Sequence, residues 1–418
     1  MTAQDFLQKA TDNISNDPYS RISSGMKNAI SHSNVLFDVH SHAFNWRDIP
    51  RDYMQKRILE ELGVINNVFR YWKDEAELLW LITGGKKRLI ENLKKDRFQL
   101  LEILKNKYES LGFHPIFSLL IMDMRAISGV REDDFSVYKA SQVAMKNKYP
   151  DNVLLFFALD PSNSKLYEEF LDAFKAGGDY FGVKIYPSLG FLPSHPKLMP
   201  IFKICEEKNI PVTAHCSSAS TRSSKREINI TGLDNKTFQP FSKVEKFTSA
   251  AGKYKRIFNN PHNWLPVLAH YPTLSLNLAH FGGGDEFMRY FRTLVTINEL
   301  TDASEKDRLR KWIRDSSWVY QILTMMSKYL NVYADISYMI YETTMFNFIK
   351  TCVKDYPFTN SRILYGSDFP LTESESKFAE QFDKIMQNFA SEQIWPKMIV
   401  SNAKDYLFRE NAPDLPVP

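Results

Sequence analysis

The stretch VLFDVHSH at residues 35–42 is the clearest indication of the fold. It begins as an apolar run of strand length and ends in two histidines, His40 and His42. Side chains alternate along an extended chain, so both imidazoles point to the same side. An apolar run with ionisable residues at its end is typical of a buried parallel strand whose carboxyl end carries chemistry.

Further runs of the same kind follow in order along the chain and predict the other strands. They lie at 116–122, 153–159, 182–186, 211–214, 274–279, 332–336 and 362–365. Both faces of these runs are expected to be buried and apolar. Segments of helical period, clearest at 165–176 and 198–208, lie between them. Strands alternating with helices predict an α/β protein, a (β/α)₈ TIM barrel with long helical insertions. A doubly wound sheet is the alternative, but no Gly-x-Gly-x-x-Gly follows the first strand.

The domain organisation predicted from these runs is one elaborated barrel. Residues 1–34 are expected to form an N-terminal helical extension, and residues 35–418 a single metal-dependent barrel domain. Insertions are expected at about 43–112, 217–272 and 285–330. The first and third have helical patterns, whereas the second begins with a polar stretch typical of a flexible loop.

Composition excludes several classes of protein. The 418 residues carry 53 basic and 49 acidic side chains, a net charge of +4 that is too small for a dedicated nucleic-acid binder. No apolar run reaches the roughly 18 residues that a membrane span needs. The three cysteines argue against a disulfide framework and for a reducing compartment, so a cytoplasmic location is expected. Aromatic residues make up 14%, enough to fill a core or line a pocket.

Ionisable residues also end three later strands of the predicted barrel. His215 follows PVTA, His280 follows LNLA, and Asp368 follows ILYGS. His-x-His on its own is more often a pair of polar loop residues, but in a parallel barrel all these strand ends share one face. Three imidazoles and a carboxylate suit a divalent transition metal, and Zn²⁺ is the ion expected.

Six segments together resemble the amidohydrolase superfamily, and are most similar to the branch that includes aminocarboxymuconate-semialdehyde decarboxylase. They are FDVHSH, GVKIYP, PVTAHC, LNLAHFGGG, NVYADISY and ILYGSDFP. The resemblance implies a metal-dependent TIM barrel with one ion favoured and two possible. It implies that His40, His42 and His215 are metal ligands, that Asp368 is a ligand or a partner of the water, and that His280 is the acid/base residue.

Lys184, in GVKIYP, has three possible roles. In binuclear relatives a lysine ending the fourth strand is carboxylated and bridges two metals. It could instead bind a substrate carboxylate, or pair with a neighbouring acid. Weaker substrate-binding candidates lie just beyond strand ends; these are Trp46, Arg125, Tyr186 and Tyr338. For Arg125 a structural ion pair is the more frequent alternative, and core packing explains many aromatics equally well. The thiol of Cys216 is expected to be buried and inert.

The resulting hypothesis is a hydrolase that uses metal-activated water on an amide, ester or lactone bond of a small organic substrate. The alternative is a metal-dependent non-oxidative decarboxylase, a carbon–carbon lyase, with the same ligands. A third hypothesis is that the barrel is a catalytically silent scaffold. The presence of all the expected site residues argues against it. No nucleic-acid or membrane partner is expected, and homo-oligomerisation stays open.

Overall fold

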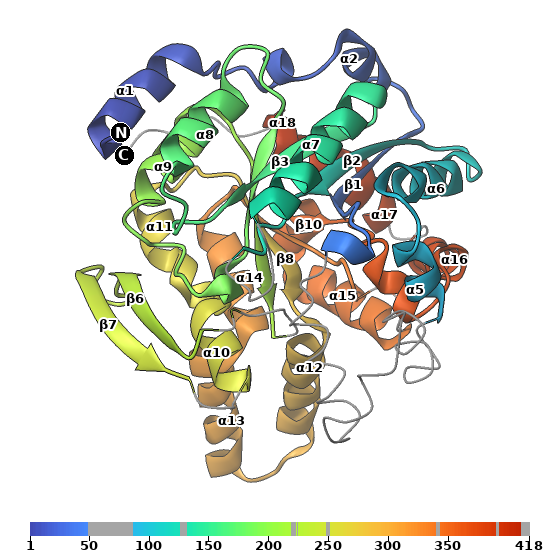
Figure 1. Ribbon diagram of the computed structural model, residues 1–418. Coiled ribbons are helices and arrows are strands. Elements are labelled where there is room, and N and C mark those ends of the chain that lie inside the picture. Colours follow the sequence, from blue (N-terminus) through green and yellow to red (C-terminus); the bar gives the residue numbers. More distant parts are fainter. Residues whose placement is uncertain are drawn as a thin grey trace, which may run out of the picture.

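Eight parallel strands form the centre of the structure, a computed structural model (Figure 1). It describes residues 1–48, 87–125, 132–218, 223, 225–247, 251–339, 343–389 and 393–410. Within these residues the strand order is β1-β2-β3-β4-β5-β8-β9-β10. The strands are β1 (Val35–Ser41), β2 (His114–Leu120), β3 (Val153–Leu159), β4 (Gly182–Ile185), β5 (Val212–Ser217), β8 (Leu276–Gly282), β9 (Val332–Asp335) and β10 (Ile363–Leu364).

The sheet closes on itself between β1 and the segment that follows β10. The amide of Val39 donates to the carbonyl of Tyr365 at 3.0 Å, and the amide of Asp368 donates to the carbonyl of His40 at 2.8 Å. The predicted (β/α)₈ barrel is therefore confirmed. Closure also places the histidines of the first strand beside the acid of the last one.

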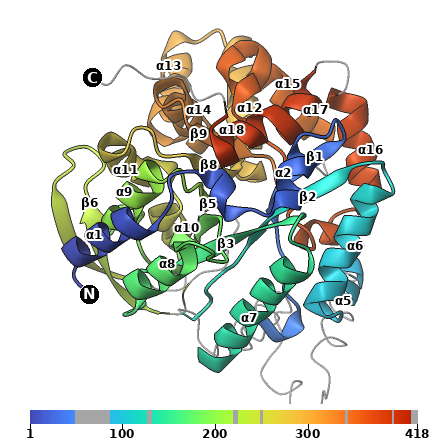
Figure 2. The same cartoon turned by 90° about the horizontal axis from the view of Figure 1, so that it is seen from above.

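Helices cover the outside of the barrel (Figures 1 and 2). They are α1 (Ala3–Asn13), α2 (Ser24–Ile30), α5 (Lys87–Leu93), α6 (Arg97–Glu109), α7 (Glu132–Lys148), α8 (Leu166–Phe174), α9 (Met199–Glu207), α10 (Ala251–Phe258), α11 (Leu265–His270), α12 (Gly284–Glu299), α13 (Ala303–Ser316), α14 (Trp318–Lys328), α15 (Thr343–Asp355), α16 (Phe378–Phe389), α17 (Ile394–Pro396) and α18 (Asn402–Phe408). None of these described helices is both long and apolar enough to cross a membrane.

Side chains alternate between the outer and inner faces of the barrel strands. On β4, Val183 and Ile185 belong to the large core that the sheet shares with the helices. Lys184 lies between them and therefore points into the barrel. Both faces are buried, as predicted, but the expectation of two apolar faces is wrong near the carboxyl ends. There the inner face carries polar side chains, namely Lys184, His215 and Asp335, and the polar residues Thr213 and Asn277 lie near the start of β5 and β8.

The amino end of the barrel is filled by aromatic rings. Phe408 on α18 lies with its ring centroid 5.2 Å from that of Phe181 and 6.2 Å from that of Phe37. Helices α2 and α18 lie over this end (Figure 2). This end is consequently closed by apolar packing.

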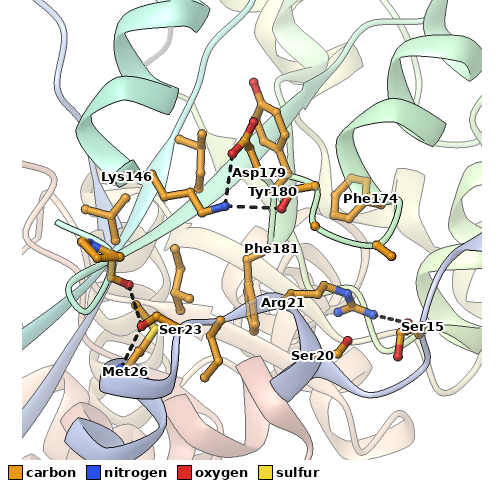
Figure 3. A pocket seen from close by; sticks show the side chains of 18 of the residues that line it. Ser15, Ser20, Arg21, Ser23, Met26, Lys146, Phe174, Asp179, Tyr180 and Phe181 are labelled. Atoms are coloured by element: carbon orange, nitrogen blue, oxygen red, sulfur yellow. Dashed lines mark hydrogen bonds and ion pairs between the residues drawn. The ribbon is translucent and has the colours of Figure 1, made fainter. Parts of the chain in front are cut away.

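The N-terminal extension packs against the barrel beside a cavity of about 280 Å³ (Figure 3). Arg21 donates hydrogen bonds to the carbonyls of Asn209 at 3.0 Å and Ser15 at 2.8 Å. Lys146 forms an ion pair with Asp179 at 3.4 Å. Lys175, the third cation of the cavity wall, pairs with Asp172. The contacts of Arg21 and Lys146 hold the extension and the 177–181 loop in place.

The insertions differ in how well the sequence predicts them. The stretch 285–330 is helical as expected and forms most of α12 together with α13 and α14. The stretch 217–272 holds a hairpin of β6 (Glu227–Leu233) and β7 (Pro240–Lys246), so the expected flexible loop is wrong for residues 227–233. Of the first insertion, α5 and α6 are described and helical, whereas residues 49–86 lie outside the described residues.

Candidate active site

Two histidines of β1 and the acid after β10 form a compact group at the carboxyl end of the barrel. Nε2 of His42 lies 3.3 Å from Oδ1 of Asp368, and Nε2 of His40 lies 3.6 Å from the same atom. The three potential ligand atoms lie within 4.8 Å of one another, and all three side chains are buried. Such a set could hold a divalent cation.

The tautomers of these histidines follow from their second ring nitrogens. Nδ1 of His42 lies 3.0 Å from the carbonyl oxygen of Leu120, and Nδ1 of His40 lies 3.0 Å from Oδ2 of Asp335. A carbonyl or carboxylate oxygen only accepts, so each Nδ1 carries the proton. When the rings are neutral, the lone pair of each is on Nε2, which faces Asp368. Oδ1 of Asp368 is buried and has no hydrogen-bond donor in the described structure.

Asp335, at the end of β9, orients His40 and was missed as a site residue by the sequence analysis. Its carboxylate accepts hydrogen bonds from Nδ2 of Asn277 at 2.7 Å, from the amide of His280 at 3.0 Å, and from the amide and hydroxyl of Ser337. Burial alone would raise its pKa, but His40 and these donors hold the pKa of Asp335 well below its ordinary value. The available signal was an acid at a predicted strand end, in NVYAD.

His40 is electrically neutral in this environment. Burial lowers the pKa of His40 to about 3, and the positive charge of Lys184 acts in the same direction. A histidine must be unprotonated to bind a metal ion. The site therefore presents His40 in the state that a ligand requires.

His280 and His215 form a directly bonded pair beside this group. Nδ1 of His280 lies 3.1 Å from the carbonyl oxygen of Ser337 and so carries the proton. Nε2 of His280 then accepts from Nδ1 of His215, at 3.1 Å. This arrangement puts the lone pair of His215 on Nε2, the tautomer shared by His40 and His42. His215 itself belongs to neither group of potential metal ligands found in the described residues.

Strained or crowded backbone positions support the site. His280 and Asp368 have positive φ angles of 64° and 50°, and Tyr338 has one of 57°. Such angles are uncommon outside glycine and cluster at functional sites. Gly366 lies so close to β1 that a Cβ there would be 2.5 Å from Cβ of His40. Only glycine permits this approach.

A buried hydrogen-bond network holds the two ligand segments together from behind. Oδ1 of Asp38 accepts from the amides of Ser367 at 2.9 Å and His40 at 3.3 Å. Its Oδ2 accepts from the hydroxyl of Tyr108 on α6, at 2.9 Å. Burial raises the pKa of Asp38 to about 6. Asp38 thus ties the segment containing His40 to the one containing Asp368.

Lys184 is the remaining ionisable side chain of the inner face. It is 2% exposed, and its ammonium has no hydrogen-bond partner among the described residues. Burial lowers its pKa to about 8, and Asp335 and Asp368 act against this shift. A buried cation without a partner is costly, so its presence here calls for an explanation.

The weaker sequence candidates are placed differently. The ring of Tyr186 lies 4.4 Å from that of His215, at the site. The hydroxyl of Tyr338 donates to Glu375 at 2.8 Å. Arg125 is bonded to the carboxylate of Asp123, with Nε 2.9 Å from Oδ1, the structural alternative considered above. The side chain of Trp46 lies outside the described residues.

Comparison with known proteins identifies the family. A family model described as amidohydrolase matches residues 37–409. The chain belongs to the amidohydrolase family. Its fold resembles 5-carboxyvanillate decarboxylase from Novosphingobium aromaticivorans, solved with manganese and a nitrobenzoic acid, at 13% identity and a TM-score of 0.52, covering 94% of this chain and 99% of that one. A probable 2-pyrone-4,6-dicarboxylic acid hydrolase from Acinetobacter baumannii matches at 13% identity and 0.48, covering 90% and 99%. No curated protein sequence matches.

As an amidohydrolase the chain is an enzyme of a metal-dependent family. The predicted divalent metal is supported by this membership and by the grouped ligand atoms of His40, His42 and Asp368. The family match alone does not choose the reaction, because one barrel fold hosts many chemistries.

Proposed function

We propose that this amidohydrolase cleaves a C–N or C–O bond of a small organic substrate, an amide, ester or lactone, with one divalent ion, Zn²⁺, held by His40, His42, His215 and Asp368. The observation that carries the proposal is the convergence of two fixed Nε2 lone pairs on the buried Asp368 carboxylate. Three electron-rich atoms this close favour a cation between them.

The chain's own residues supply orientation and proton transfer. A bound divalent ion would polarise a carbonyl group and increase the acidity of water. Oδ1 of Asp368, which has no donor in the described structure, is placed to accept a proton from that water. His280, whose Nε2 carries a lone pair, would take up that proton from Asp368 and pass it to the leaving group, which requires its bond to His215 to open. Burial of the whole set excludes bulk water.

Alanine variants of the histidines test these roles separately. His40→Ala and His215→Ala are expected to lower both metal content, measured by elemental analysis, and turnover. His280→Ala is expected to lower turnover with metal content retained. His270→Ala, which changes an exposed histidine at the end of α11, is the control. Metal loss in His280→Ala would show that His280 is a ligand instead, and full metal content in His40→Ala would overturn the site.

Decarboxylation is the second candidate function, supported by the buried ammonium of Lys184, which has no hydrogen-bond partner among the described residues. A substrate carboxylate would be attracted by that charge. The metal-loaded enzyme should therefore be offered lactones and amides on one side, and carboxylated aromatic and enoic acids on the other. Release of CO₂ from the acids, with no hydrolysis of the first group, would replace hydrolysis by decarboxylation.

The silent-scaffold hypothesis makes its own measurable prediction. A metal that binds only the native state raises the melting temperature. If added Zn²⁺ or Mn²⁺ neither binds to the metal-free protein nor stabilises it, the barrel is a scaffold and the proposed function is wrong.

A further inference from the structure

Lys184 occupies a position on the inner face of β4 that faces the candidate site. Its register partners are Ala158 on β3 and Thr213 on β5. Since its chain neighbours Val183 and Ile185 pack outward into the core, the lysine side chain points into the barrel. It is close enough to His40, Asp335 and Asp368 to interact with each electrostatically.

Neither nearby carboxylate forms a hydrogen bond with Lys184 in the described structure. Asp335 is bonded to His40, Asn277, Ser337 and the amide of His280. The ion-pair contacts of Asp368 in the described structure are with His40 and His42. Nζ of Lys184, in contrast, is buried and has no hydrogen-bond partner among the described residues.

The charges of the site leave a place for an anion. A divalent ion would balance the carboxylates of Asp335 and Asp368, and His40 is neutral. The ammonium of Lys184 is then the charge that remains. A buried charge is stable in a protein when an opposite charge or a hydrogen-bond partner interacts with it. A carboxylate of the substrate would be such a partner for Lys184.

We propose that Lys184 binds a carboxylate group of the substrate, which makes the natural substrate a small organic acid. This inference rests on the proposed function, whose reacting bond it leaves open. The buried ring of Tyr186, two residues further along and tilted against the ring of His215, offers a flat wall for an unsaturated or aromatic portion of the same molecule.

Binding of benzoate and of its neutral analogue benzamide tests the proposal without requiring turnover. Calorimetry would compare wild-type protein with Lys184→Met, which keeps the length of the side chain and removes the charge. A charged hydrogen bond contributes enough for an affinity loss of about 10-fold or more for benzoate. Benzamide affinity should not change. Lys203→Met, on the exposed face of α9, is the matched control.

The stability of Lys184→Met provides an independent measurement. Because the variant removes a buried charge that has no hydrogen-bond partner among the described residues, its melting temperature should be equal to or above that of the wild type. A merely structural lysine would show the opposite, a lower melting temperature with benzoate affinity retained.

Two results would overturn the proposal. One is equal benzoate affinity in wild-type and Lys184→Met protein, including no measurable binding to either. The other is a carbamate on Lys184, seen as a ¹³C signal after exchange with labelled bicarbonate, together with two metal ions per chain. Metal content is measured separately. A protein that binds no metal would contradict the proposed function. Benzoate binding can still be compared between wild-type and variant protein without metal, so the two failures are distinguishable.

Discussion

The two ends of this barrel bury side chains of opposite character. At the amino end, rings of Phe37, Phe181 and Phe408 pack against one another under α18. At the carboxyl end, the inner face carries histidines, two carboxylates and Lys184. Both ends are equally inaccessible to water, yet apolar burial stabilises a fold whereas buried charge opposes it. The difference shows which end maintains the fold and which end carries chemistry, as in other barrels.

The largest expected effect comes from the amino end. Phe37→Ala removes a fully buried ring and should lower the free energy of unfolding by about 3–5 kcal/mol, measured by urea denaturation. Val244→Ala, at a position 59% exposed, should change it by less than about 0.5 kcal/mol. Metal content per folded Phe37→Ala molecule should equal that of the wild type. A selective loss of metal would show that the two ends are not independent.

At the carboxyl end, Asp335→Asn should weaken metal binding by about 10–100-fold, the usual effect of removing a carboxylate that orients a histidine ligand. The amide no longer fixes the proton of His40 on Nδ1, so its Nε2 lone pair is lost in part of the molecules. Metal titration of the apo-protein measures this. Asp383→Asn, exposed on α16, is the control. Unchanged affinity in Asp335→Asn would remove Asp335 from the metal site.

Gly366→Ala tests the packing of the same end. The added methyl group would meet Cβ and the backbone nitrogen of His40 at 2.5 Å and 3.2 Å. Backbone of β1 cannot move away cheaply, so we expect a loss of about 1–3 kcal/mol in stability and weaker metal binding. Gly284→Ala is the control because its Cβ would meet only the flexible Met345 side chain, at 3.3 Å. Similar effects in both variants would mean that the crowding at His40 is unimportant.

The sequence was sufficient for the fold because each strand and its order depend on local apolar runs. It was also sufficient to select His40, His42, His280 and Asp368 as candidates, since position at a strand end is a local property. The bond between His40 and Asp335 joins residues far apart in the chain, and closing the barrel creates it. The missing partner of Lys184 is likewise a property of the assembled site. The β6–β7 hairpin was missed because its strands are polar and exposed.

The smallest expected effect concerns the cysteines. They belong to the packed core and are not expected to take part in catalysis. Cys205, Cys216 and Cys352 are buried and free, and burial raises the pKa of each thiol, that of Cys352 to about 12. Thiolate is the reactive form, so native protein at pH 8 should not react with a thiol reagent, while urea-unfolded protein should react at all three sites.

Cys216→Ala, next to His215, should cost about 1 kcal/mol of stability and leave turnover and metal content close to wild type. A native thiol that reacts at once, together with inactivation, would instead make Cys216 part of the active site.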